Sequence, residues 1–187
     1  SFSVMYKAND LWNIFANYGK SFAPLQYSQM ANTNASGAYL TMQGLQPEKA
    51  NNYEIGTHYL DPYLSLEFTL FYIDFSDELK RDDATQTYSN LGATEHKGAE
   101  FGFKYNLGAI SDELSGISLY ANTTYTEATT SAGENKGQDL DFYSQLVGNA
   151  GIDYKVDQWT LNTNFYGQSG QTASGTHDAT GRYGNIP

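Results

Sequence analysis

The sequence predicts an all-β fold, an antiparallel up-and-down transmembrane β-barrel, to which these 187 residues contribute about eight strands. Apolar and polar residues alternate with a period of two, which places successive side chains on opposite faces of a strand. Several of these stretches reach about ten residues, longer than the five or six usual in soluble sheets. The links between them alternate between short and long along the chain.

The alternation is clearest in the last predicted strand, where Trp159, Leu161 and Phe165 are separated by amides and hydroxyls. In the fourth predicted strand, Phe71 and Ile73 are exceptions, because they stand on an otherwise polar face. Read along the whole chain, the pattern predicts strands over Phe2–Ala8, Trp12–Lys20, Asn52–Leu60, Leu64–Phe75, Tyr88–Tyr105, Gly116–Ala128, Gln145–Val156 and Trp159–Gln168.

The links between the predicted strands form two classes. The short ones are Asn9–Leu11, Asp61–Tyr63, Asn106–Ser115 and Asp157–Gln158. The long ones, rich in Ser, Thr, Asn, Gly and Asp, are Ser21–Asn51, Ser76–Thr87, Thr129–Ser144 and Ser169–Pro187. Outer-membrane barrels have tight turns at one rim and long external loops at the other. About 9–11 residues suffice for a strand to cross a bilayer, so the predicted strands are long enough.

In this interpretation the apolar faces meet lipid, and we expect Phe68, Leu70, Ile152, Leu161 and Phe165 among the lipid-facing residues. Tyr and Trp near strand ends suit the two headgroup zones. These aromatic residues are Trp12, Tyr18, Tyr59, Tyr63, Tyr72, Tyr105, Tyr125 and Trp159. Two alternatives remain open: a soluble β-rich binding domain, and a self-contained eight-stranded barrel with a structural or adhesive role.

Composition excludes several classes of protein. The 21 acidic and 10 basic residues give a formal net charge of −11, which argues against a nucleic-acid partner. Without cysteine there is no thiol nucleophile and no thiolate metal site. No apolar run approaches the roughly 20 residues of a transmembrane helix, and the first residues lack the pattern of a signal peptide.

The two ends of the sequence favour a segment of a larger barrel over a closed small one. The chain starts within SFSVMYKA and finishes in the polar stretch SGTHDATGRYGNIP, which is not a strand able to pair with the first one. An unpaired strand edge facing lipid would leave backbone groups unbonded, at several kcal/mol each. We therefore expect residues 1–187 to form one segment of barrel wall.

Six stretches follow one another in a recognisable order over some 140 residues. They are PEKANNYEIGTHY (Pro47–Tyr59), LFYIDFSDEL (Leu70–Leu79), NLGATEHKGAEFGFKY (Asn90–Tyr105), ISLYANTTYTEA (Ile117–Ala128), GNAGIDYKVDQWTLN (Gly148–Asn162) and GRYGNIP (Gly181–Pro187). From about Gln46 onward the sequence resembles the carboxy-terminal part of TonB-dependent outer-membrane receptors, particularly the ferric-citrate and ferric-siderophore branch.

The resemblance implies a 22-stranded barrel with an N-terminal plug domain, so that the plug, the TonB-interacting segment and the closing strands lie outside this chain. It implies an outer-membrane receptor that takes up a ferric chelate with energy supplied through the TonB complex. The iron complex is cargo, and no resident cofactor is expected. Glu95 departs from the family pattern, in which a basic residue often precedes the run His96-Lys97-Gly98, and this departure leaves the ligand specificity open.

Ligand-binding residues are expected on the long loops and at the outer rim, where a ferric chelate first meets the protein. Such chelates are rich in oxygen acceptors, so Arg, Gln, Tyr and His are suitable donors. The candidates are Arg81, Gln86, Tyr88, Gln168, Gln171, His177 and Arg182.

Catalysis and metal binding find little support in the sequence. The three histidines, His58, His96 and His177, fall on separate predicted elements, and no nucleophile–base pair is distinctive. The acidic pairs Asp82-Asp83 and Asp139/Asp141 lack the dense spacing of a calcium-binding loop. We expect neither an enzyme nor a protein metal site.

Overall fold

The structure, a computed structural model, describes residues 1–26, 29, 44–82, 87–90, 92–132, 136–140 and 143–171. The described residues form ten β-strands and two short 3₁₀ helices. The strands are β1 (Phe2–Lys7), β2 (Trp12–Ala23), β3 (Glu48–Leu60), β4 (Leu64–Ser76), β5 (Leu79–Asp82), β6 (Thr87–Asn90), β7 (Ala93–Asn106), β8 (Ile117–Thr130), β9 (Leu146–Val156) and β10 (Trp159–Gln168). The 3₁₀ helices are η1 (Leu107–Ala109) and η2 (Asp112–Leu114).

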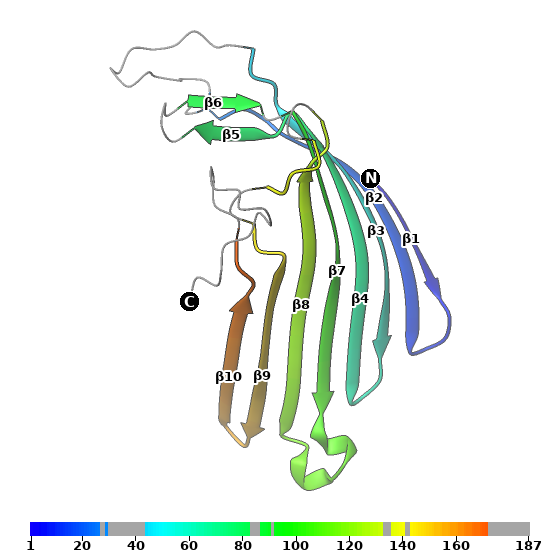
Figure 1. Cartoon of the computed structure of the whole chain (residues 1–187). Helices are drawn as coiled ribbons and strands as arrows, with labels where there is room; N and C mark the ends of the chain where they lie inside the picture. The colour runs from blue at the N-terminus through cyan, green and yellow to red at the C-terminus, as the bar shows by residue number, and fades with distance from the viewer. Residues whose placement is uncertain are drawn as a thin grey trace.

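Eight of these strands form one antiparallel sheet in the order β1-β2-β3-β4-β7-β8-β9-β10, while β5 and β6 form a separate hairpin. Figure 1 shows the long strands side by side in one curved sheet, with the hairpin across one end. We call that end the loop end and the opposite end the turn end. The predicted meander of sequence neighbours is confirmed, and β1 and β10 do not pair with each other in the described chain.

One side of the sheet is apolar, and no other part of the described chain packs against it. In β4 this apolar face consists of Leu66, Phe68, Leu70 and Tyr72, and the register aligns the apolar positions of the other strands with it. The five residues predicted to face lipid are all exposed, by 41% for Phe68, 47% for Leu70, 46% for Ile152, 59% for Leu161 and 71% for Phe165. No second sheet covers them in the described residues, as a lipid-facing side requires.

The opposite, polar face carries aromatic rings that lie over glycines of the neighbouring strand. Phe15 pairs with Gly56, and a Cβ on Gly56 would come within 2.5 Å of the Phe15 ring. Phe71 pairs with Gly98 in the same way, with a corresponding distance of 2.7 Å. A ring laid over a glycine covers backbone that would otherwise be open. This explains the exception at Phe71 in the predicted strand.

Side chains of Asn or Asp organise three links at the turn end. Asn9 Oδ1 accepts hydrogen bonds from the Trp12 amide and from the amide before it, each at 2.9 Å. Asp61 Oδ1 likewise accepts from the amides of Tyr63 and Leu64, at 2.7 and 2.8 Å. The Tyr59 hydroxyl, followed by these two amides, lowers the pKa of Asp61. The Asn106 side chain accepts from an amide of η1. Such bonds fix tight reversals of the chain.

The predicted strand Tyr88–Tyr105 is wrong, because it spans two strands, β6 and β7, that belong to different sheets. Gly92 adopts a φ of 99°, in the left-handed region that favours glycine, so the chain can change direction there. The predicted loop Ser76–Thr87 also contains β5, which pairs with β6. A pattern of period two cannot distinguish one long strand from two short ones separated by a bend.

The other predicted strands are confirmed, with shifted ends. β2 and β3 run further toward the loop end than expected, because their ladder continues to the pair Ala23 and Glu48. The link Asn106–Ser115 contains η1 and η2. Within the described part of the chain, no helix has the length and apolar character needed to span a membrane.

We expect Phe68→Arg, in the middle of the apolar stretch Leu64–Tyr72, to destabilise the barrel by about 2–4 kcal/mol, because a charge at mid-depth of a bilayer is costly. Chemical unfolding of the intact protein in lipid vesicles measures this free energy. The matched variant is Asn122→Arg, on the exposed polar face of β8. Equal losses in the two variants would contradict a lipid-facing Phe68.

Candidate functional site

Side-chain bonds to backbone atoms fix the β5–β6 hairpin to the loop end of the main sheet. Asn90 pairs with Gln46 in both directions: the Gln46 amide donates to Asn90 Oδ1 at 2.9 Å, and Asn90 Nδ2 donates to the Gln46 carbonyl at 3.0 Å. Asn90 Nδ2 also donates to the carbonyl of Asp77. The Leu79 amide donates to Glu48 Oε1 at 2.7 Å. The hairpin and the segment that enters β3 are therefore joined.

A partly buried cluster lies where the chain leaves β4 for the hairpin. The hydroxyl of Thr94, a fully buried residue, donates to the Glu78 carboxylate, and His96 Nε2 lies 4.0 Å from Glu78 Oε2. The His96 ring contacts Phe75 on β4 and Tyr143 before β9, with ring centroids 5.0 and 5.5 Å apart. We call these five residues the loop-end cluster.

Opposing effects act on the pKa of the Glu78 carboxyl group. Burial raises its pKa, but the neighbouring His96 imidazole and the Thr94 hydroxyl outweigh burial, and the pKa of Glu78 lies below its usual value of 4.5. Glu78 is therefore a carboxylate at neutral pH, and its ionised form stabilises the base of the hairpin.

The structure brings together two of the predicted ligand-binding residues. Arg81 on β5 and Tyr88 on β6 are directly paired in the backbone register of the hairpin. Gln86, His177 and Arg182 lie outside the described residues. The proposed role of all five in ligand binding stays a prediction.

The other two candidates lie at the end of β10 and just beyond it. Gln168, the last residue of β10, accepts a hydrogen bond from the Tyr166 hydroxyl at 3.0 Å. Gln171 Nε2 donates to Ser144 Oγ at 3.0 Å, so it ties the segment after β10 to the segment before β9. Gln171 therefore holds two loop-end segments together, which the sequence pattern did not reveal.

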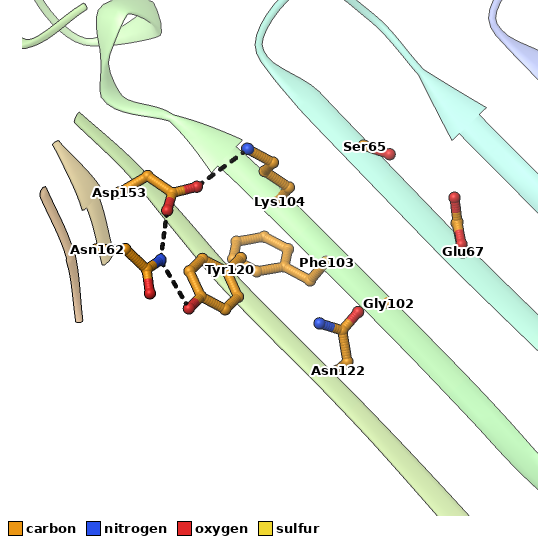
Figure 2. Close-up of a pocket in the computed structure, with 9 residues that line it drawn as sticks. All are labelled: Ser65, Glu67, Gly102, Phe103, Lys104, Tyr120, Asn122, Asp153 and Asn162. Carbon is orange, nitrogen blue, oxygen red and sulfur yellow. Dashed lines mark hydrogen bonds and ion pairs between the residues drawn. The ribbon is translucent and has the colours of Figure 1, made fainter. Parts of the chain in front are cut away.

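The polar face carries a hydrogen-bonded network nearer the turn end, beside a shallow open hollow (Figure 2). Lys104 Nζ lies 3.2 Å from Asp153 Oδ2, and Asn162 Nδ2 donates to Asp153 Oδ1 at 2.6 Å. Asn162 also donates to the Tyr120 hydroxyl at 3.0 Å, and that hydroxyl donates to Asn164 Oδ1 at 3.2 Å. The network spans β7 to β10 and presents amides and hydroxyls toward the inside of the barrel.

The described residues offer no site for a protein-bound metal. They contain no group of three or more His, Asp or Glu side chains that could hold a metal ion. His58 packs against Phe15 with ring centroids 4.8 Å apart and the rings tilted by 40°, whereas His96 belongs to the loop-end cluster. The two described histidines thus have separate packing partners.

Glu95, which departs from the family pattern, lies on the apolar side of the sheet near the loop end. It accepts hydrogen bonds from the Tyr72 hydroxyl at 3.1 Å and from Thr129 Oγ1 at 3.5 Å. Its neighbour His96 points to the opposite face, because adjacent strand residues alternate. The Glu95 carboxylate therefore does not line the inside of the barrel.

Sequence reasoning missed the residues that hold the loop end together, above all Glu78, Asn90 and His96. Their contacts join residues that lie 13 to 47 positions apart. One signal was available: His96 falls on the polar face of a strand, close to a long link. Nothing in the local sequence, however, identifies its partners.

The long strands form a single sheet with one polar and one lipid-facing side. Tight turns lie at one end of the sheet and long loops at the other. These features define the wall of an outer-membrane β-barrel. The chain belongs to the TonB-dependent receptor family: the family model described as "TonB dependent receptor-like, beta-barrel" matches residues 1–186. The predicted resemblance and the outer-membrane location are thereby confirmed. The loop end is accordingly the external end. This family consists of receptors and transporters.

Two curated relatives are similar to most of this chain. The probable TonB-dependent siderophore receptor PiuA of Acinetobacter baumannii is 26% identical over 145 residues, which cover 75% of this chain and 19% of that protein. The catecholate siderophore receptor Fiu of Escherichia coli UTI89 is 30% identical over 139 residues, which cover 73% of this chain and 17% of that protein. The matched stretch is less than a fifth of either relative.

Solved structures of other outer-membrane proteins are similar to the sheet of this chain. The unliganded ferric citrate transporter FecA superposes with a TM-score of 0.68 at 34% identity, over 90% of this chain and 25% of that one. The ferric yersiniabactin uptake receptor FyuA of Yersinia pestis gives a TM-score of 0.71 at 19% identity, over 97% and 27% of the two chains. At that identity, FyuA supports the fold alone.

The base of the hairpin should loosen in acid, because the lowered pKa of Glu78 makes its ionised form stabilising. The stabilisation is complete above pH 4.5, the unperturbed pKa, and is lost as the pH falls through the lower folded-state pKa. Hydrogen exchange at the Leu79 amide, corrected for intrinsic rates, measures the loosening. Glu78→Gln should weaken this pH dependence, while the carboxylate of Glu48, which accepts from the same amide, is kept.

The matched control is Glu113→Gln, an exposed carboxylate in η2 at the turn end. This variant should retain the wild-type pH profile at Leu79. A profile unchanged by Glu78→Gln would show that another group controls the hairpin.

Proposed function

We propose that this chain is part of the barrel wall of an outer-membrane receptor that imports a ferric chelate with energy supplied through TonB. The family match over residues 1–186 carries the proposal. The named relatives support the substrate class, since PiuA is described as a probable siderophore receptor, Fiu as a catecholate siderophore receptor and FecA as a ferric citrate transporter. A ferric citrate or ferric siderophore complex is therefore the proposed cargo.

The arrangement of the loop end supports a receptor role. Cargo arriving from outside first meets the hairpin and the segments beside β9 and β10. Arg81 and Tyr88, paired on the hairpin, are the proposed donors to oxygen atoms of the chelate, together with Gln86, Gln168, Gln171, His177 and Arg182. Arg presents a planar fork of donors that matches a carboxylate.

We further propose that more strands complete the wall and that a plug domain fills it. The edges of β1 and β10 are unpaired in the described structure. Backbone groups cannot face lipid without hydrogen-bond partners, so the membrane-embedded sheet requires closure. The hydrogen-bonded polar face around Asp153 and Asn162 would then line an interior shared with the plug.

Uptake of the chelate should depend on TonB, because the outer membrane has no ATP supply of its own. We expect cells that express the intact receptor to accumulate radioactive iron from ferric citrate or a catecholate siderophore, and to lose this uptake when TonB is deleted. Binding of the chelate to cells should persist in the deletion strain. Full uptake without TonB would contradict the proposed energy coupling.

A separate experiment tests the proposed binding residues. Replacing Arg81 and Arg182 by Ala should weaken chelate binding by about 1.5–3 kcal/mol for each direct contact, or roughly ten- to a hundredfold, because each change removes charged donors. Calorimetric titration of the purified receptor measures the affinity. Lys136→Ala, which removes an exposed cation before β9, is the matched control. Unchanged affinity in the double variant would remove both arginines from the site.

A further inference from the structure

The apolar, lipid-facing side of the sheet ends at one row of residues near the loop end. In β2, β3 and β4 this row holds Tyr18, Tyr53 and Tyr72, whose neighbouring rings lie 5.1 and 6.2 Å apart. In β7 and β8 the same row continues with Lys97 and Glu127. Tyrosine suits the headgroup zone of a bilayer, because its ring is apolar and its hydroxyl is polar. The row therefore marks the outer border of the apolar side.

The depth of this row agrees with its position at the border. Leu64 begins the apolar side of β4 at the turn end, and Tyr72 lies eight residues further along the strand. At about 3.3 Å per residue and a tilt of about 40°, this stretch covers roughly 20 Å of depth. The apolar band of an outer-membrane barrel is about 25 Å tall. Lys97 and Glu127, on the two strands beside β4, thus lie at the level of the external lipid headgroups.

Charged side chains of both signs gather at this border. Lys97 Nζ lies 3.2 Å from Glu127 Oε2, and both side chains are half-exposed. One row further toward the loop end, Asp74 lies directly opposite Glu95. Like charges in this arrangement repel each other, and neither carboxylate forms an ion pair with a cation among the described residues. We call these four residues the border patch.

Tyrosine hydroxyls orient two carboxylates of the border patch. The Tyr72 hydroxyl donates to Glu95 Oε2 at 3.1 Å, and the Tyr125 hydroxyl donates to Glu127 Oε1 at 2.9 Å. A carboxylate can accept about four hydrogen bonds, and an ammonium group has three donors. Glu95, Glu127 and Lys97 therefore keep the capacity for further bonds, on the side of the wall that faces lipid.

We propose that the border patch binds the headgroup of an external-leaflet lipid that carries a primary ammonium group beside a phosphate. The ammonium group donates to the carboxylates of Glu95 and Glu127, and the phosphate accepts from Lys97. Three carboxylates and one ammonium favour a zwitterionic headgroup, because they repel a purely anionic one. A quaternary ammonium has the same charge but no N–H donor. The inference depends on the lipid-facing side of the wall and not on the cargo.

Native mass spectrometry of the intact receptor in detergent with added lipid tests the border patch. Among lipids with identical acyl chains, phosphatidylethanolamine should stay bound about three- to tenfold more than phosphatidylcholine or phosphatidylglycerol, as expected for about one hydrogen bond. Glu95→Gln should remove most of this preference, because it removes a charged acceptor. Glu100→Gln, on the same strand but on the polar face, is the matched control and should keep the preference.

A second variant tests the orientation of the carboxylate. Tyr72→Phe keeps the ring at the border and removes only the hydroxyl that holds Glu95, so it should weaken the preference with no change in charge. Equal retention of the three lipids by the wild-type receptor would overturn the proposal, as would a full preference in Glu95→Gln or an equal loss in Glu100→Gln. If Glu95→Gln does not fold, Tyr72→Phe decides, and an unchanged preference there overturns the proposal.

Discussion

The need to bond every backbone amide and carbonyl within a lipid bilayer governs this structure. Water is absent there, so the ladder of each strand must be continuous. The register meets this need over long stretches, from Trp12 opposite Tyr59 to Ala23 opposite Glu48. Side chains then serve the two surroundings of the wall: rings and aliphatic groups on one face, amides and carboxylates on the other. The small number of buried apolar residues follows, because lipid takes the place of a protein core.

Much of the fold could be predicted from the sequence, because its determinants are local. The alternation around Phe68 and Leu161 follows directly from strand geometry, and Asp61 marks a turn through bonds to amides two and three residues away. The hairpin could not be predicted in this way. Its strands have four residues each, too few for alternation to be read, and the bend at Gly92 depends on one dihedral angle.

The candidate site was less predictable, because its contacts join segments distant in the sequence. The choice of hydrogen-bond donors on long loops identified Arg81 and Tyr88, which are paired in the hairpin. The same choice could not predict that the Asn90 side chain bonds to the backbone of Gln46. Nor could residue type alone assign His96 to a contact at the loop end, since His58 occupies the same face and packs against the Phe15 ring instead. Burial and partners, which only the folded arrangement determines, separate the two histidines.

The excursion between β4 and β7 leaves and re-enters the wall at a matched pair, Ser76 opposite Ala93. No residue between these two belongs to the hydrogen-bonded ladder of β4 and β7, which is complete without them. Its length and sequence can therefore diverge between related proteins without disturbing the registry of the wall. At such a junction the outward surface can change while the ladder of the wall is kept, so a foreign peptide inserted there could be displayed on the outside of a bacterial cell.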